Sequence, residues 1–283
     1  MVVNVNQVTT LAPTYTFWGA LSGTYLMGTT GTIANGAGAG MGRLKGVSEV
    51  NIPQASVSRV TPQGDNAAIT TFTVQPQELP SGTINLVVLN QDFSAKANGS
   101  KVYTDGDWDE VGDGQPCYNL ADLGFVFNCP AASQDSGSID EAGWNVYELY
   151  KVQVQSSLMA QMQTGQSPTF PNNVTTKRSS ANFAGRSFSV ANDNATSFIV
   201  KQYWSDYPVT YYTFIGDNST TTFTLNELPP AANAASVQYW LAGVKKAYTT
   251  DYTVNASTGL VTAVVAPGTA VKTVVKQKFL PTC

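Results

Sequence analysis

The sequence predicts a mainly β protein with one short helix, in which a larger β domain precedes a small β-sandwich. Three observations lead to this prediction. Apolar and polar residues alternate in many short segments after residue 44, which is the pattern of half-buried strands. Proline, glycine and short polar runs separate these segments. The last ~70 residues hold five or six of them, which is typical of a small immunoglobulin-like sandwich.

The first region, residues 1–40, is rich in threonine, glycine and alanine. Glycine loses more conformational freedom than any other residue when the chain becomes ordered. We therefore expect residues 1–40 to form a flexible N-terminal arm or loop.

The larger β domain is expected over residues 41–208, and the sandwich over residues 209–283. Residues 94–143 are polar around one aromatic patch and are expected to form a long insertion loop. A connection of this length in a compact domain is usually functional or interfacial.

Two strands of the larger domain have strong patterns. Gly82–Leu89 is apolar on both faces, which predicts burial on both sides. In Trp144–Val154, one face is expected to hold Trp144, Val146, Tyr150, Val152 and Val154, with Glu148 as the exception. The residues from Gln155 to Gln163 are the predicted short helix, because Leu158 and Met162 stand four positions apart. Further strands are expected at residues 68–74, 183–190, 197–204, 220–225, 236–241, 251–254, 260–265 and 270–279.

The composition excludes several classes of function. The chain contains no histidine, which rules out Ser-His-Asp and Cys-His catalysis and imidazole metal ligands. The net charge of −4 argues against general affinity for nucleic acid. Charged residues make up 12%, about half the usual share, which fits a subunit that covers its surface with copies of itself. We expect no enzyme activity and no cofactor.

Neither a signal peptide nor an apolar run of ~18 residues is recognisable, so we expect no membrane insertion. Of the three cysteines, Cys117 and Cys129 are close enough in sequence to bridge one loop. Free thiols are the favoured interpretation, because the odd count does not describe a disulfide framework. Cys283 could pair only if the C-terminal tail is docked.

An acidic segment is the best-defined part of the expected insertion loop. Its carboxylates are Asp105, Asp107, Asp109, Glu110 and Asp113. A calcium loop is weakly indicated by Asp105, Asp107 and Asp109. An EF-hand, however, needs glycine at position 6 and glutamate at position 12 of the loop, and this sequence has Glu110 and Pro116 at those positions. A solvated turn or a negative patch facing a lumen is favoured, and all five residues are candidates for that patch.

Other clusters have simpler explanations. The glycines at 36–42 lack the spacing of a nucleotide-binding loop. Carboxylate pairs at 107 and 109, or 135 and 140, fit acidic turns better than a glycosidase. Packing between the domains is favoured over sugar binding for Tyr203, Trp204, Tyr207, Tyr211 and Tyr212. Edge charges are favoured over attachment to a bacterial surface for Lys245, Lys246, Lys272, Lys276 and Lys278.

The C-terminal region resembles a known class of module. Phe214–Leu225, Asp251–Val261, Ala266–Gly268 and the final alternating strand are similar to small β-sandwich modules of tailed-bacteriophage virion proteins. The preceding region resembles a phage major tail protein, the subunit of the tail tube. This resemblance lies in the order of a Gly-rich arm, Arg43–Val47, a strand pair, a long loop, and Val146–Val154 followed by a short helix.

The resemblance implies a tail-tube-type β-sandwich or barrel and a structural role in the virion tail. Such subunits form hexameric rings that stack into a hollow tube, through which DNA passes without specific binding. The implied partners are other copies of the chain and other tail and head-to-tail connector proteins, assembled in the host bacterial cytoplasm. The appended sandwich would decorate the outside. Six copies would carry about −24 per ring, and inward-facing charge would repel DNA phosphate.

Two alternatives stay open at this point. The first is a capsid decoration or head-fibre protein, which would copurify with filled heads and form no tubes. The second is a surface-adhesion or carbohydrate-binding β module, which would stay a small oligomer and bind glycans through tyrosine and tryptophan.

Overall fold

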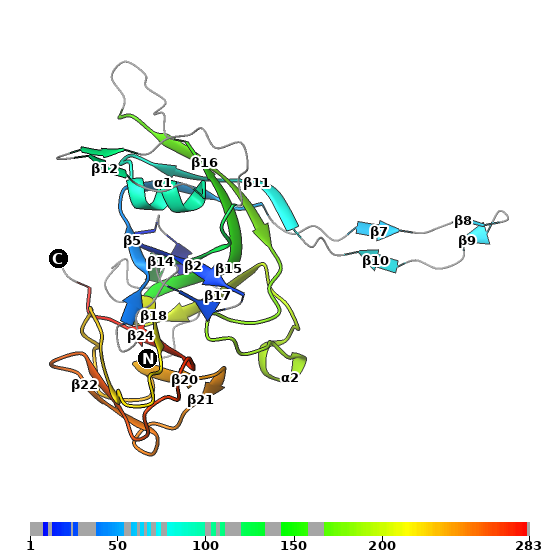
Figure 1. Cartoon of the computed structure of the whole chain (residues 1–283). Helices are drawn as coiled ribbons and strands as arrows, with labels where there is room; N and C mark the ends of the chain where they lie inside the picture. The colour runs from blue at the N-terminus through cyan, green and yellow to red at the C-terminus, as the bar shows by residue number, and fades with distance from the viewer. Residues whose placement is uncertain are drawn as a thin grey trace.

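The computed structural model confirms a mainly β fold and shows two short helices. A larger β body lies next to a smaller β module, and a narrow ribbon extends away from the body (Figure 1). The residues described are 8–10, 13–23, 25–27, 38–53, 58–60, 63–64, 67–68, 72–74, 78–99, 103–105, 108–110, 120–133, 143–157 and 167–281.

The body is built on one antiparallel sheet. Its main path runs in the order β3 (Tyr25–Leu26), β2 (Tyr15–Ser22), β14 (Leu123–Ser133), β15 (Trp144–Ser156), β16 (Phe170–Lys177), β11 (Glu78–Leu86) and β6 (Val47–Asn51). Off this path, β1 (Val8–Thr10) pairs with β14, and β17 (Val200–Ser205) pairs with the first half of β15.

Consecutive strands close this sheet into a barrel. β5 (Gly42–Leu44) pairs with β2, while β6, only two residues later, pairs with β11 at the opposite end of the sheet. Gly46 lies between them with φ +74°, a conformation that L side chains rarely adopt. One short stretch of chain therefore connects both ends of the sheet and brings them together, although β5 and β6 are not paired with each other.

A β-bulge in β15 directs its side chains to two different cores. Opposite β14, the register shifts between Leu149 and Val152. Val146 and Tyr150 consequently face the small module, whereas Leu149, Val152 and Val154 face the barrel interior. The prediction that Val146, Tyr150, Val152 and Val154 share one face is wrong, because simple alternation does not survive an inserted residue.

Helix α1 (Gln91–Ala97) covers the barrel interior. Asn90 caps it by accepting a hydrogen bond from the Phe93 backbone N–H at 2.9 Å. Phe93 is fully buried, with its ring centroid 5.2 Å from that of Trp18 and 6.0 Å from that of Phe125. This helix was not predicted.

Several sequence expectations are corrected by these elements. Residues 94–143 are not one loop, because they contain the end of α1 and the buried central strand β14. Residues 1–40 are not one flexible arm, because β2 is a central strand with Trp18 only 2% exposed. Within the expected helix 155–163, the first two residues belong to β15, and residues 158–163 lie outside the described part.

Two further expectations differ in detail. Residues 183–190 form isolated bridges and lead into the short helix α2 (Val190–Asp193) instead of a strand. The strand expected to reach Leu89 ends at Leu86, and Val88 is 52% exposed, so this strand end is not buried on both sides.

The C-terminal module is a two-sheet sandwich, and most of its strands lie where the sequence predicts them. One sheet has the order β21 (Val244–Lys245), β20 (Val237–Leu241), β24 (Lys272–Lys278), β18 (Val209–Ile215) and β4 (Gly38–Gly40). The other has the order β19 (Thr222–Thr224), β23 (Leu260–Ala263) and β22 (Tyr252–Asn255). Phe214, Phe223 and Tyr239 pack between them.

Strand β4 comes from the N-terminal region and extends the sandwich sheet. It pairs with β18, and a Cβ atom at Gly40 would stand 2.9 Å from the Tyr212 ring. Only glycine allows this close approach without displacing the ring.

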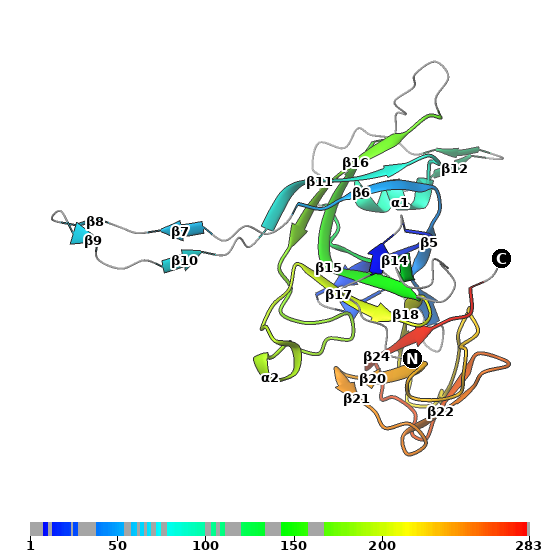
Figure 2. The ribbon, with the colours of Figure 1, turned by 180° about the vertical axis from the view of Figure 1, so that it is seen from behind.

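The barrel and the sandwich share a third hydrophobic core. Tyr15, Phe17 and Val126 from the barrel pack in it with Trp240 and Phe279 from the sandwich. The two modules therefore bury apolar surface against each other. The back view shows them next to each other (Figure 2).

Asn128 fastens the start of the sandwich to the barrel. This side chain is fully buried. It donates to the backbone oxygens of Tyr15 and Val209 at 3.1 Å and accepts from the Val209 N–H at 2.7 Å. Asn128 of β14 therefore connects β18 of the sandwich with β2 and β14 of the barrel.

Candidate functional site

A paired ribbon stands outside the body. β7 (Ser58–Val60) pairs with β10 (Phe72–Val74), and β8 (Gln63–Gly64) pairs with β9 (Ala67–Ala68). These four strands lie well away from both modules in the two ribbon views (Figure 1). Each pair is a separate two-stranded sheet among the described strands. A two-stranded hairpin is marginal in water without a surface to pack on.

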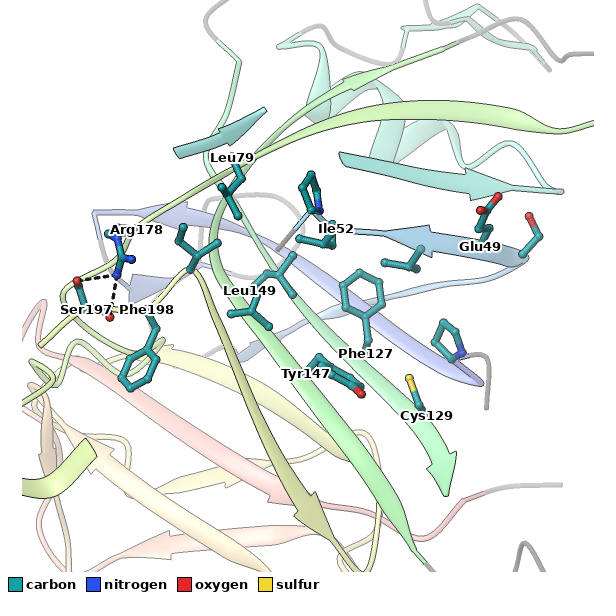
Figure 3. Close-up of a pocket in the computed structure, with 16 residues that line it drawn as sticks. Glu49, Ile52, Leu79, Phe127, Cys129, Tyr147, Leu149, Arg178, Ser197 and Phe198 are labelled. Atoms are coloured by element: carbon teal, nitrogen blue, oxygen red, sulfur yellow. Dashed lines mark hydrogen bonds between the residues drawn. The ribbon is translucent and has the colours of Figure 1, made fainter. Parts of the chain in front are cut away.

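An open apolar groove of about 900 Å³ lies on the barrel near the base of this ribbon. The β6 segment forms one wall and residues 197–200 form the other, over a floor from β14 and β15 (Figure 3). The lining residues are Pro13, Ser48, Glu49, Val50, Ile52, Pro53, Leu79, Phe127, Cys129, Tyr147, Leu149, Arg178, Ser197, Phe198, Ile199 and Val200.

One wall of the groove includes an edge strand. Among the described strands, β6 pairs only with β11. It thus has one side with backbone donors and acceptors that a further strand could pair. The opposite wall is already bonded in part, because the backbone N–H and oxygen of Phe198 pair with Ser179. An apolar floor beside the β6 edge is suited to receive a strand or hairpin.

The polar groups of the groove are held in place. Asn85 donates a hydrogen bond to the Glu49 carboxylate at 2.8 Å. Arg178 donates to the backbone oxygen and to the hydroxyl of Ser197, each at 3.3 Å (Figure 3). Cys129 is a free thiol, and burial raises its pKa to about 12, which makes it unreactive in the folded protein. The free thiol of Cys129 speaks against the alternative bridge to Cys117, and Cys117 and Cys283 themselves lie outside the described residues.

The predicted acidic patch forms a hairpin in part. Asp105 ends β12 (Tyr103–Asp105), while Asp109 and Glu110 lie in β13 (Trp108–Glu110). The two strands are antiparallel partners, with Asp105 opposite Trp108. Asp107 and Asp113 lie outside the described residues. The described residues contain no group of three or more Cys, Asp or Glu side chains that could hold a metal ion.

A buried carboxylate links the barrel to the sandwich. Glu148 of β15 is 2% exposed. Its Oε1 accepts from the hydroxyls of Tyr203 and Tyr211 at 2.6 Å and from Lys276 Nζ at 2.8 Å, while Oε2 accepts from the Tyr150 hydroxyl. We call these five residues the Glu148 cluster.

The surroundings of Glu148 keep its carboxylate ionised. Burial by itself raises the pKa, but the Lys276 ammonium and hydrogen bonds from Lys276, Tyr150 and Tyr203 outweigh it, and the pKa is lowered. The pKa values of Tyr150, Tyr203 and Tyr211 are raised, first by burial and then by the Glu148 charge.

The Glu148 cluster accounts for part of the aromatic set singled out in the sequence. Tyr203 and Tyr211 point their hydroxyls at Glu148 between the modules, and Tyr212 is in the sandwich core. Tyr203 and Tyr211 thus pack at the junction, as predicted, whereas Tyr212 packs inside the sandwich. The signal for the cluster was Glu148 itself, a carboxylate within an apolar strand face.

Comparison with known protein families and with curated sequences finds no match to this chain. Within the described part, neither helix has the length and apolar character required to cross a membrane.

Proposed function

We propose that this chain is a structural subunit of a tailed-bacteriophage tail tube. In this role, copies form hexameric rings that stack into a hollow conduit for DNA. The observation that carries the proposal is the combination of a ribbon outside the body with a groove beside the edge strand β6 on the body.

The ribbon and the groove are two different surfaces of one molecule. A contact between different surfaces of identical subunits is head-to-tail, and it generates closed rings or open filaments depending on the rotation it imposes. A tube uses one such contact around each ring and another between rings. The ribbon supplies the contact between rings in this proposal, because it reaches farthest from the body.

The composition supports an extensive contact surface. Charged residues account for only 12% of the chain, so much of the surface can be covered without removing ionised groups from water. The barrel provides a stable platform for such contacts, since the pairing with β11 holds the edge strand β6 in place.

The acidic hairpin β12–β13 is proposed to face the lumen. Negative charge there would repel DNA phosphate and let the genome slide. Replacement of Asp105, Asp109 and Glu110 by the corresponding amides is expected to leave tube formation intact and to slow DNA ejection. An unchanged ejection rate would remove this part of the proposal.

The decisive experiment is negative-stain electron microscopy of concentrated subunit. Hollow tubes of uniform diameter are expected for the native chain. A variant in which residues 61–71 are replaced by Asn-Gly joins β7 to β10 through a two-residue turn and shortens the ribbon. It is expected to fold and to form no tubes.

A matched control is available on the sandwich. Val264 and Val265 are 63% and 75% exposed, so Val264→Ser with Val265→Ser should leave assembly unchanged. Tubes of normal length from the shortened-ribbon variant would contradict the role given to the ribbon. A native chain that stays monomeric at high concentration, together with full-length tails on particles that lack it, would contradict the proposal as a whole.

A further inference from the structure

A second cavity lies between the barrel and the sandwich, beside the Glu148 cluster. Its volume is about 280 Å³. Taking about 30 Å³ per water molecule, it has room for a small ion with part of its hydration shell, and it is at the lower limit for a larger organic ligand. We call it the junction cleft.

The lining of the junction cleft carries an excess of positive charge. Four cationic side chains line it, namely Arg186, Lys201, Lys245 and Lys276. Two carboxylates, Glu148 and Asp193, also line it, and their side chains are 2% and 4% exposed. Two positive charges therefore have no counter-charge in the lining.

Both carboxylates are already engaged. Glu148 is held by Lys276 and three tyrosines. Asp193 Oδ1 accepts from Lys201 Nζ at 3.0 Å, and its Oδ2 pairs with the Arg186 guanidinium. Neither carboxylate is placed to neutralise Lys245 as well.

Arg186 has unused donor capacity in the cleft. Its Nη2 atom pairs with Asp193, but its Nε–H is buried and has no hydrogen-bond partner. A buried guanidinium N–H without a partner costs free energy that an acceptor would recover. The planar guanidinium fork matches the spacing of oxygens in phosphate-type anions.

Lys245 completes the arrangement from the sandwich side. The turn before it packs closely on Arg186, since a Cβ at Gly243 would lie 3.1 Å from the Gly185 oxygen. Trp240 is flanked by both cations, with its ring centroid 5.9 Å from the Arg186 guanidinium carbon and 6.0 Å from Lys245 Nζ. Trp240 of the sandwich thus contacts one cation from each module.

The electrostatic effect on Lys276 agrees with this arrangement. Burial lowers the pKa of Lys276 and Glu148 opposes this, while Lys201 and Lys245 lower it further. The lowering of the Lys276 pKa by two other lysines indicates a positive potential in the cleft.

We propose that the junction cleft binds one small oxyanion of the phosphate type, held by Arg186, Lys201 and Lys245. The anion balances the excess charge and bridges the two modules. This inference does not depend on the tail-tube proposal, because it concerns the isolated subunit.

The test is equilibrium binding of inorganic phosphate to the purified full chain at constant ionic strength, with chloride as the reference anion. We expect one phosphate per subunit with a dissociation constant of about 1 mM or lower. Lys245→Gln is expected to weaken binding about tenfold or more. Lys246→Gln is the matched control, because Lys246 is the next lysine in the chain and does not line the cleft.

Thermal unfolding of the same proteins checks that the variants fold. Phosphate is expected to raise the unfolding temperature of the native chain and of Lys246→Gln more than that of Lys245→Gln. Absence of saturable phosphate binding, or equal binding by the two lysine variants, would overturn the proposal. Phenyl phosphate is then tested in place of inorganic phosphate to separate two sources of the ligand. If both compounds bind and both depend on Lys245, the site accepts a phosphate group that is attached to a larger molecule. If only inorganic phosphate binds, the ligand is the free ion.

Discussion

Replacement of Glu148 by glutamine should weaken the junction between the two modules. The substitution keeps the shape of the side chain and removes its charge. Lys276 then lacks its counter-charge at a position where its side chain is only 23% exposed, and three tyrosine hydroxyls lose a carboxylate acceptor.

The magnitude follows from the burial of the pair. Removing one partner of a buried ion pair costs about 3–5 kcal/mol, because the remaining charge stays desolvated. Glutamine can still accept hydrogen bonds, so we expect about 3 kcal/mol of lost unfolding free energy. For a chain of this size that corresponds to a fall of about 6–12 °C in the unfolding temperature.

Urea unfolding followed by tryptophan fluorescence and circular dichroism measures this loss. Asp206→Asn is the matched control, because Asp206 also faces a β24 lysine, Lys278, but at 3.5 Å and with 58% exposure. The control should lose at most about 1 kcal/mol. Equal losses in Glu148→Gln and Asp206→Asn would refute the reasoning that burial makes the Glu148 cluster the main polar link.

Three further predictions follow from individual residues. Gly124→Ala should lower the free energy of unfolding in denaturant by about 1–3 kcal/mol, because its Cβ would lie 2.4 Å from the buried Phe183 ring. Gly268→Ala, whose Cβ would be 3.4 Å from its nearest neighbour, should leave the free energy of unfolding nearly unchanged. The free energy of unfolding should fall as pH rises above 10, the ordinary tyrosine pKa, because tyrosines with a raised folded-state pKa resist ionisation only in the folded protein. It should also fall as pH drops below about 4.5, because the lowered pKa of Glu148 stabilises the folded state only above that range. A urea midpoint that is constant from pH 4 to 11 would contradict both expectations. In a chain with its other two cysteines replaced by serine, Cys129 should react with a thiol reagent only after unfolding, and rapid labelling of folded protein would show that its burial is incomplete.

The sandwich was predictable because its strands are short and regular. Val237–Leu241, Tyr252–Asn255 and Leu260–Ala263 each alternate between core and surface, and each is bounded by turn residues. Local pattern and tertiary position agree there, so the sequence alone locates the strands to within a few residues.

The barrel was harder to predict because its decisive features depend on distant contacts. Tyr15–Ser22 precedes a glycine-rich stretch and is buried only because β14 and β5 flank it. The bulge between Leu149 and Val152 leaves no mark in an alternating pattern. A missed signal did exist for α1, since Asn90 followed by Asp92 is a typical helix start.

The Glu148 cluster was only half visible in the sequence. Glu148 stood out as a carboxylate within an apolar strand face, which implies a buried partner. Its partners Tyr211 and Lys276 lie 63 and 128 residues further along the chain, and no local pattern connects them.

The pairing of β4 with β18 has a consequence for synthesis on the ribosome. Gly40 emerges roughly 170 residues before its partner Tyr212, which corresponds to about 10–30 s of translation. Throughout that interval β4 has no partner strand, because the rest of the sandwich sheet has not yet been made. We expect this sheet to form only once synthesis is nearly finished, since its central strand β24 lies near the C-terminal end of the chain.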